Sequence, residues 1–317
     1  MEVSLVIPTY NRREIVRRSL ETLFNQDFPA SDFEIIAVVD GSIDGTAQTL
    51  RNLKPKCRFR VIEQENRGLA GARNTGFRAA KSELVLFLDD DMRADPGLVG
   101  AHVRAHQRLG PAAVFGSLFL SQDSTANLAS ECFRREIGAF HLRRSLDPNQ
   151  EWGVSECVFS NSSIPKQILA NAGGFDESFR MREDLELGMR LRALGVRMEY
   201  ADEAVAYQYY NKTSADLLED ARKFAVADLM FERKYPGQRI EGLLRVSDED
   251  LSWKRSMRAV LSRSPVLEKT LLAPLCVLGD ACFWFIPLRW AGVRALQMRR
   301  RIHWLRALRG IAGSGLR

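Results

Sequence analysis

The sequence predicts an α/β fold in which a mostly parallel central sheet is flanked by helices, with a helical extension at the carboxyl end. Two observations predict it. The first ninety residues alternate between strand-length apolar runs and helical patterns, which is typical of a parallel sheet with helices on both faces. The runs Ser4–Ile7, Glu34–Val39 and Leu84–Leu88 are also almost continuously apolar, as expected for strands that are buried on both faces.

The individual elements follow in order along the chain. Residues 145–164 are polar, contain a tryptophan and show no clear period, so we expect a loop there on the acceptor side of the site. Pro236-Gly237 marks the end of the globular unit. We expect strands at Val3–Pro8, Phe33–Val39, Phe59–Glu63, Leu84–Leu88 and Ala113–Leu120, and helices at Arg13–Asn25, Thr46–Leu53, Leu69–Ala80, 95–109, 126–142, near Pro165, at 182–194 and at 214–235.

Charge and length divide the chain into two predicted domains, 1–242 and 243–317. The whole chain has 317 residues and a net charge of +6, but residues 243–317 contain 14 Lys and Arg against 5 Asp and Glu. A basic segment with tryptophans suits an anionic membrane surface or a nucleic acid, and its apolar content favours the membrane over nucleic acid. The carboxyl-terminal domain is therefore predicted to be a basic, amphipathic, membrane-associating extension.

Within that extension, Leu271–Ala291 is apolar over about the length of a bilayer-spanning helix. Asp280 lies at its centre, and a central Asp costs about 3 kcal/mol on insertion scales. An interfacial helix is favoured over a spanning helix, and a helical hairpin that covers the catalytic domain is the third alternative. The following Arg299, Arg300, Arg301, Trp304, Arg306 and Arg309 are expected to contact lipid headgroups.

The amino terminus and the cysteines predict the compartment. Residues 1–8 read as an acidic residue followed by a strand, without the basic and apolar regions of a signal peptide. The five cysteines are odd in number and show no CxxC spacing, which favours reduced packing thiols. We expect a cytoplasmic protein, peripheral at the inner face of the cell membrane, and the sequence leaves a homo-oligomer open.

Polar residues follow the ends of the predicted strands, where open parallel sheets bind ligands. Pro8, Thr9 and Asn11 follow the first strand, Asp40 follows the second, and Asp89-Asp90-Asp91 follow Leu84–Leu88. Three successive carboxylates beside a buried strand repel one another unless a cation or a proton relieves the charge. Mg²⁺ or Mn²⁺, bound by one or two carboxylates together with water and phosphate oxygens, fits this pattern better than a solvated acidic turn.

The loop that begins at Asp40 superficially resembles a calcium-binding loop. Asp40, Ser42 and Asp44 carry oxygens at the first, third and fifth positions, and Gly45 stands at the sixth. Arg51 occupies the twelfth position, where an EF-hand needs a bidentate Glu, so this class of site is excluded. Asp44 is also expected to cap the following helix.

Four motifs in the first 95 residues occur together and in order, and a fifth follows later. By them the sequence resembles the family 2 glycosyltransferases, which have the Rossmann-like GT-A fold, over about residues 1–235. The motifs are Val6-Ile7-Pro8-Thr9-Tyr10-Asn11-Arg12, Asp40-Gly41-Ser42-x-Asp44-Gly45-Thr46, Asn66-x-Gly68-x4-Arg73-Asn74-x-Gly76, Asp89-Asp90-Asp91 and Glu183-Asp184-Leu185-Glu186-Leu187.

The resemblance implies a nucleotide-sugar donor and assigns residues to it. The pocket after the first strand, with Pro8, Thr9 and Asn11, would hold the nucleotide base together with Asp40. The Asp-x-Asp motif maps to Asp89 and Asp91. Asp91 would bind the metal, Asp89 would lie near the ribose and the metal, and Arg73 and Asp90 would lie by the nucleotide, although Asp90 is expected to be dispensable.

The resemblance further implies an inverting reaction with a base in the later motif. Asp184, with Glu183 beside it, begins a predicted helix, where the positive end of the helix dipole favours an ionised carboxylate. Many relatives carry a His after the following strand, whereas this chain has Gln208. His102 and His106 have zinc-compatible spacing but lack the HExxH glutamate, so we expect them on an exposed helix and not as ligands.

The function predicted from these residues is transfer of a sugar from a nucleotide-diphosphate sugar, with UDP as the family default. The acceptor is predicted to be a hydroxyl of a glycan, polysaccharide or lipid-linked glycan. The alternative is a related protein that binds nucleotide sugars, has lost catalysis and acts as a scaffold. The intact Asp91 and Asp184 favour the enzyme.

Overall fold

A computed structural model describes residues 2–146, 158–237 and 252–313. They form two compact units, one made of residues 1–122 and 150–209, the other of residues 123–149 and 210–317. The predicted division at residue 242 lies in a segment outside the described residues and stays a prediction.

The first unit is built on an eight-stranded sheet with the order β3-β2-β1-β4-β7-β6-β8-β5. Strands β7 and β5 run against the other six, since each pairs only in antiparallel fashion with its neighbours, so the sheet is mostly parallel as predicted. The strands are β1 Val3–Thr9, β2 Phe33–Asp40, β3 Arg58–Gln64, β4 Leu84–Leu88, β5 Met92–Ala94, β6 Ala113–Leu120, β7 Asn161–Pro165 and β8 Met198–Gln208.

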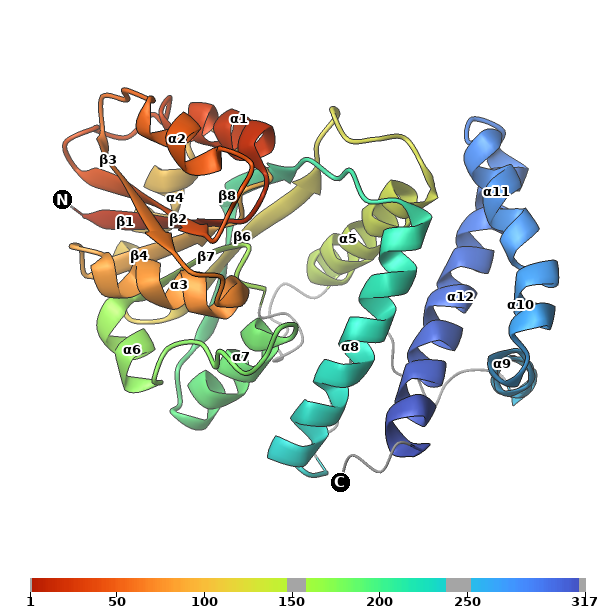
Figure 1. The fold of residues 1–317 in the computed structure, drawn as a ribbon. Helices are drawn as coiled ribbons and strands as arrows, with labels where there is room; N and C mark the ends of the chain where they lie inside the picture. The colour runs from red at the N-terminus through yellow and green to blue at the C-terminus, as the bar shows by residue number, and fades with distance from the viewer. Residues whose placement is uncertain (1, 147–157, 238–251, 314–317) are drawn as a thin grey trace. The chain divides into compact units, whose positions relative to one another are not determined.

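Helices cover both faces of this sheet (Figure 1). Leu20 of α1, Leu50 of α2 and Val99 of α4 pack in one buried cluster with Leu5 of β1, on one face. The next β1 side chain, Val6, points to the opposite face, where a Cβ on Gly76 of α3 would lie 2.2 Å from it, so only glycine lets α3 approach so closely. The helices are α1 Arg13–Leu23, α2 Thr46–Arg51, α3 Gly68–Ala79, α4 Leu98–Leu109, α6 Lys166–Asn171 and α7 Glu183–Ala193.

Two parts of the first unit differ from the sequence prediction. Part of the expected loop 145–164 is strand β7, and residues 147–157 of that loop lie outside the described residues. The prediction that His102 lies on an exposed helix surface was wrong. Its side chain is fully buried, and its two ring nitrogens lie 2.8 Å from Ser163 Oγ and 3.0 Å from Asn161 Oδ1. Asn161 and Ser163 of β7 can thus be buried because the α4 histidines satisfy their side-chain oxygens.

The second unit is helical. Gly279 of α11 and Gly292 of α12 meet so closely that a Cβ on Gly279 would lie 2.9 Å from the Gly292 Cα, and α11 and α12 thus form a helical hairpin. No described helix is both long enough and apolar enough to cross a membrane. The helices are α5 Leu128–Leu146, α8 Ser214–Lys234, α9 Ser252–Arg263, α10 Pro265–Leu271, α11 Ala273–Ala281 and α12 Ile286–Gly313.

The arginines of α12 that were expected at lipid headgroups are largely engaged inside this unit. Arg299 and Arg306 pair with the buried carboxylate of Glu268, and Arg300 pairs with Glu136 at 2.7 Å. The indole of Trp304 is buried and donates a hydrogen bond to Asp228. These side chains hold helices together, because a buried carboxylate such as Glu268 needs cationic partners.

Candidate active site

The three aspartates lie between β4 and β5, at the carboxyl end of the parallel strands, as predicted. Their backbone is fixed on both sides. Asp89 N donates to Ser160 O at 3.1 Å, and Tyr209 N, just after β8, donates to Asp91 O at 2.7 Å. Ser19 of α1 donates its hydroxyl to Asp90 O at 2.7 Å. The backbone of the three aspartates is therefore held by residues of three segments that are distant in sequence.

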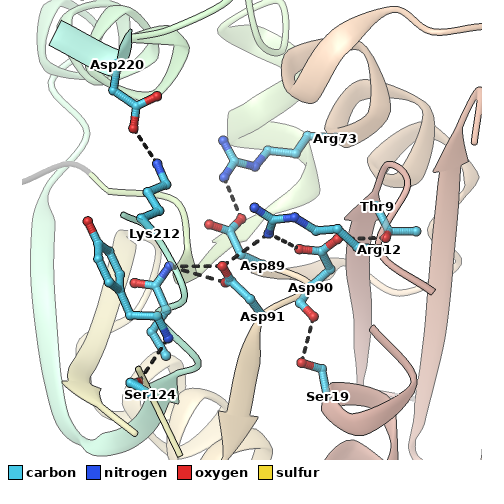
Figure 2. A network of polar contacts seen from close by, with 12 residues as sticks. Thr9, Arg12, Ser19, Arg73, Asp89, Asp90, Asp91, Ser124, Lys212 and Asp220 are labelled. Carbon is cyan, nitrogen blue, oxygen red and sulfur yellow. Dashed lines mark hydrogen bonds and ion pairs between the residues drawn. The ribbon is translucent and has the colours of Figure 1, made fainter. Parts of the chain in front are cut away.

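The second and third aspartates share one arginine. Arg12 Nη1 lies 2.8 Å from Asp90 Oδ1 and 3.1 Å from Asp91 Oδ2, and Thr9 donates its hydroxyl to Asp90 Oδ2 at 2.7 Å (Figure 2). The Arg12 side chain is 44% exposed, whereas those of Asp90 and Asp91 are 7% and 12% exposed. Arg12, a residue that we did not assign to the site from its sequence, is the cation that contacts both carboxylates.

The pKa of Asp91 is raised by its surroundings. Burial, together with the neighbouring charge of Asp90, raises the pKa of Asp91 to about 7, although Arg12 opposes the change. Gln208, at the end of β8, directs its side-chain amide to both Asp91 oxygens at 3.2 and 3.3 Å. An amide carries no charge, so more negative charge is gathered here than Arg12 alone balances.

The first aspartate belongs to a second ion-paired group. Arg73 of α3 bridges two acids, since its Nη2 lies 2.9 Å from Asp89 Oδ1 and its Nη1 lies 2.9 Å from Glu183 Oε1. The Arg73 side chain is 3% exposed. Figure 2 shows Arg73 reaching Asp89 while Arg12 reaches the other two aspartates. The aspartate cluster after β4 and the acidic start of α7 are thus connected through one buried guanidinium.

The proposed base stands at the start of α7, as predicted. Burial and the adjacent Asp184 raise the pKa of Glu183 to about 7, and burial also raises the pKa of Asp184. The residue before them, Arg182, adopts a left-handed backbone with φ of 68°, which is uncommon for a residue other than glycine and is found mostly at functional sites. The turn at Arg182 leads directly into α7, whose first two residues are Glu183 and Asp184.

The other residues assigned to the nucleotide hold loops together. Asp40 accepts from Gln64 Nε2 and from the backbone N of Arg67 and Gly68 at 2.7 to 2.8 Å, which caps the start of α3. Asn11, with φ of 50°, accepts from Ile43 N at 2.9 Å and so joins the loops after β1 and β2.

Asn74 is a further residue of the motifs to which we gave no role from sequence. Its side chain donates to Phe175 O at 2.8 Å and to Glu177 Oε1 at 2.9 Å, and it accepts from Phe175 N at 2.8 Å. The neighbour of Arg73 thereby fixes the turn at 173–176. The only sequence signal for Asn74 was its place directly after Arg73 in the motif.

The residues present fit a hard divalent cation. Mg²⁺ and Mn²⁺ prefer carboxylate oxygens and take the rest of their shell from water and phosphates, so one or two protein ligands suffice. Among the described residues, no three acidic, His or Cys side chains gather into a complete metal-holding group. Asp91 nevertheless presents an oxygen, Oδ1, whose hydrogen bond from Gln208 is long at 3.3 Å, and Asp89 is 25% exposed.

The comparisons with known proteins agree with this fold. The family model described as glycosyl transferase family 2 matches residues 4–171. Validoxylamine A glucosyltransferase of Streptomyces hygroscopicus subsp. jinggangensis is 33% identical over 227 residues, which cover 64% of this chain and 54% of that protein. Chondroitin synthase of Escherichia coli is 30% identical over 239 residues, which cover 65% of this chain and 34% of that protein.

Solved structures show the same fold. A mannosyltransferase from Pyrobaculum calidifontis, in complex with GDP-Man and Mn²⁺, superposes with a TM-score of 0.63 at 19% identity, covering 96% of this chain and 87% of that chain. S. aureus TarS in complex with UDP-GlcNAc gives a TM-score of 0.54 at 17% identity, covering 99% of this chain and 92% of that chain.

The mixed sheet with helices on both faces is similar to the fold of GT-A type glycosyltransferases. The chain belongs to glycosyl transferase family 2. It spans about half the length of the validoxylamine A glucosyltransferases that it matches.

Proposed function

We propose that this protein transfers a sugar from a nucleotide-diphosphate sugar, with a UDP-sugar as the first candidate, to an acceptor hydroxyl with inversion at the anomeric carbon. One observation carries the proposal. Arg73 joins Asp89, which follows β4, to Glu183, which opens α7, at 2.9 Å each. A donor-side acid and the acid pair of the base motif therefore belong to one charge network.

Asp91, with Asp89, would hold Mg²⁺ or Mn²⁺, and the bound ion would supply charge stabilisation for the leaving diphosphate. Two features support this assignment. The carboxylates of the site outnumber its two arginines, Arg12 and Arg73, and the excess negative charge favours a further cation. The solved mannosyltransferase with the same fold was in complex with Mn²⁺.

Residues of the chain itself would take the proton of the acceptor hydroxyl and hold the base in position. Asp184 accepts the proton of the acceptor hydroxyl while that oxygen forms a bond to the anomeric carbon. The bond from the anomeric carbon to the diphosphate oxygen breaks on the opposite face, and its electron pair leaves with the nucleoside diphosphate. Glu183, paired with Arg73, holds the helix start in place. A single displacement of this kind inverts the configuration.

The test is a panel of nucleotide sugars screened by thermal shift and by hydrolysis in the presence of Mn²⁺. We expect Asp91→Ala to abolish metal-dependent donor binding. We expect Asp184→Asn to reduce turnover by about 10²- to 10⁴-fold, the usual contribution of a general base, while donor binding is retained. Full turnover of Asp184→Asn would reassign the base. Donor binding by the wild type without any turnover would instead support the scaffold alternative.

We further propose that the protein works at the inner face of the cell membrane on a lipid-linked or envelope glycan. The excess of Lys and Arg over Asp and Glu in residues 243–317 supports this location, because anionic lipids attract basic segments. Transfer to lipid-linked acceptors in detergent, compared with water-soluble glycans, would test the acceptor class.

A further inference from the structure

An apolar surface lies on the α10–α11 side of the second unit. We call it the α11 surface. Leu267 and Leu271 of α10 are four residues apart, Leu275 and Leu278 of α11 are three apart, and each is 37% exposed or more, so each helix has an exposed apolar face. The turn before α12 adds Trp284, which is 81% exposed. The remaining members are Val266, Val277, Phe285, Ile286 and Trp290.

These side chains stand out from the rest of the described chain. Single exposed apolar residues are ordinary on protein surfaces, whereas a continuous group marks an interaction site. In Figure 1, α10 and α11 lie beside α12, in blue, and the turn that carries Trp284 joins α11 to α12. The aromatic side chains are therefore presented at one end of the helical hairpin.

The charges around the α11 surface have one sign. Within residues 264–311 there are only two acidic residues, and neither is exposed. Glu268 is 1% exposed and pairs with arginines of α12. Asp280 accepts hydrogen bonds from Leu128 N and Ser214 Oγ. Lys269 and Arg294 are exposed in the same segment.

We propose that the α11 surface docks on a membrane that contains anionic lipid, with Trp284 and Phe285 entering the headgroup region. Tryptophan side chains favour the boundary between water and hydrocarbon in a membrane. The exposed basic side chains of Lys269 and Arg294 complement anionic headgroups. Most of this surface lies in Leu271–Ala291, the segment expected from sequence at a membrane interface. The headgroup contacts expected of Arg299, Arg300 and Arg306 are replaced by those of Lys269 and Arg294, because the three arginines are paired within the unit. The inference deepens the proposed membrane location and does not depend on the identity of the donor.

The experiment is sedimentation of the full chain with vesicles of phosphatidylcholine, with and without about one third phosphatidylglycerol. We expect binding to the anionic vesicles and at least a tenfold smaller bound fraction for the double variant Trp284→Ser, Phe285→Ser. Lys269→Glu with Arg294→Glu should weaken binding to anionic vesicles alone. Val226→Ser, a change at a side chain of α8 that is 48% exposed, is the matched control and should bind like the wild type.

Two further measurements separate the possible failures. Thermal unfolding and nucleotide-sugar hydrolysis without vesicles should be unchanged in the tryptophan variant, which shows that the fold and the proposed chemistry are intact. Vesicle binding that survives the double variant would overturn the inference. A second result would also overturn the inference: the wild type forms a dimer, the double variant does not, and neither protein binds vesicles. The α11 surface would then bind a second copy of the chain instead of a membrane.

Discussion

Replacing Arg12 by Gln should lower the stability of the metal-free protein and strengthen its binding of Mn²⁺. Arg12 contacts Asp90 and Asp91 at 2.8 and 3.1 Å, and both carboxylates are nearly buried. Because Arg12 occupies an oxygen of Asp91, an incoming cation must compete with it. Without Arg12, the two carboxylates repel each other until a cation binds.

The expected loss of stability in Arg12→Gln depends on how exposed the Arg12 side chain is. Removing one partner of a fully buried ion pair costs about 3 to 5 kcal/mol, and exposed pairs are worth about 1 kcal/mol or less. Arg12 is 44% exposed, so we expect a loss of about 2 kcal/mol and a melting temperature lower by about 4 to 8 °C. The affinity for Mn²⁺ should rise on the order of tenfold, which corresponds to about 1.4 kcal/mol.

The assay is thermal unfolding with and without Mn²⁺, together with calorimetric titration of Mn²⁺ in the presence of UDP. Arg13→Gln is the matched control, because Arg13 is the next residue, has a side chain that is 49% exposed and pairs only with the exposed Glu14 among the ion pairs of the described residues. A variant at Arg12 that loses stability yet binds Mn²⁺ no more tightly than the wild type would refute competition between the arginine and the metal.

Three further predictions follow from the same geometry. Burial raises the pKa of Glu183 from 4.5 to about 7, so the folded chain holds a proton that the unfolded chain has released, and stability should fall as the pH rises through this window. Urea titrations of the wild type should show that slope, and Glu183→Gln should lessen it. Asn74→Ala removes three hydrogen bonds to the 173–177 turn and should lower the free energy of unfolding by about 2 to 3 kcal/mol in the same titrations. Arg182→Gly relieves a φ of 68° and should leave stability unchanged or raise it by about 1 kcal/mol; a clear loss would show that the Arg182 side chain matters more than its backbone.

The parallel part of the sheet was predictable because its strands are buried on both faces. Val3–Thr9 and Phe33–Asp40 are buried along their whole length, so most of their residues are apolar, and such apolar runs are visible in sequence. Strand β7 was not predictable. Its Ser162 and Ser163 are buried and polar, and the Ser163 hydroxyl is satisfied by His102 and His106, about sixty residues away.

The location of the three aspartates was likewise set by local sequence. Their ion-pair partners were not. Asp89-Asp90-Asp91 had to lie at the carboxyl end of a strand because they follow Leu84–Leu88 directly. The partners of those aspartates depend on which loops the sheet order brings together. Arg12 reaches the site because β1 lies next to β4.

The sequence by itself thus determined the order of elements in the parallel half of the sheet, the family resemblance and the place of the carboxylates, since these depend on neighbouring residues and on burial. Only the tertiary structure decided that Arg12 pairs with Asp91, that Arg73 links Asp89 to Glu183, and that the α12 arginines face inward. The physical reason is that charge pairing acts over a few ångströms between residues far apart in sequence, and no local pattern records that distance.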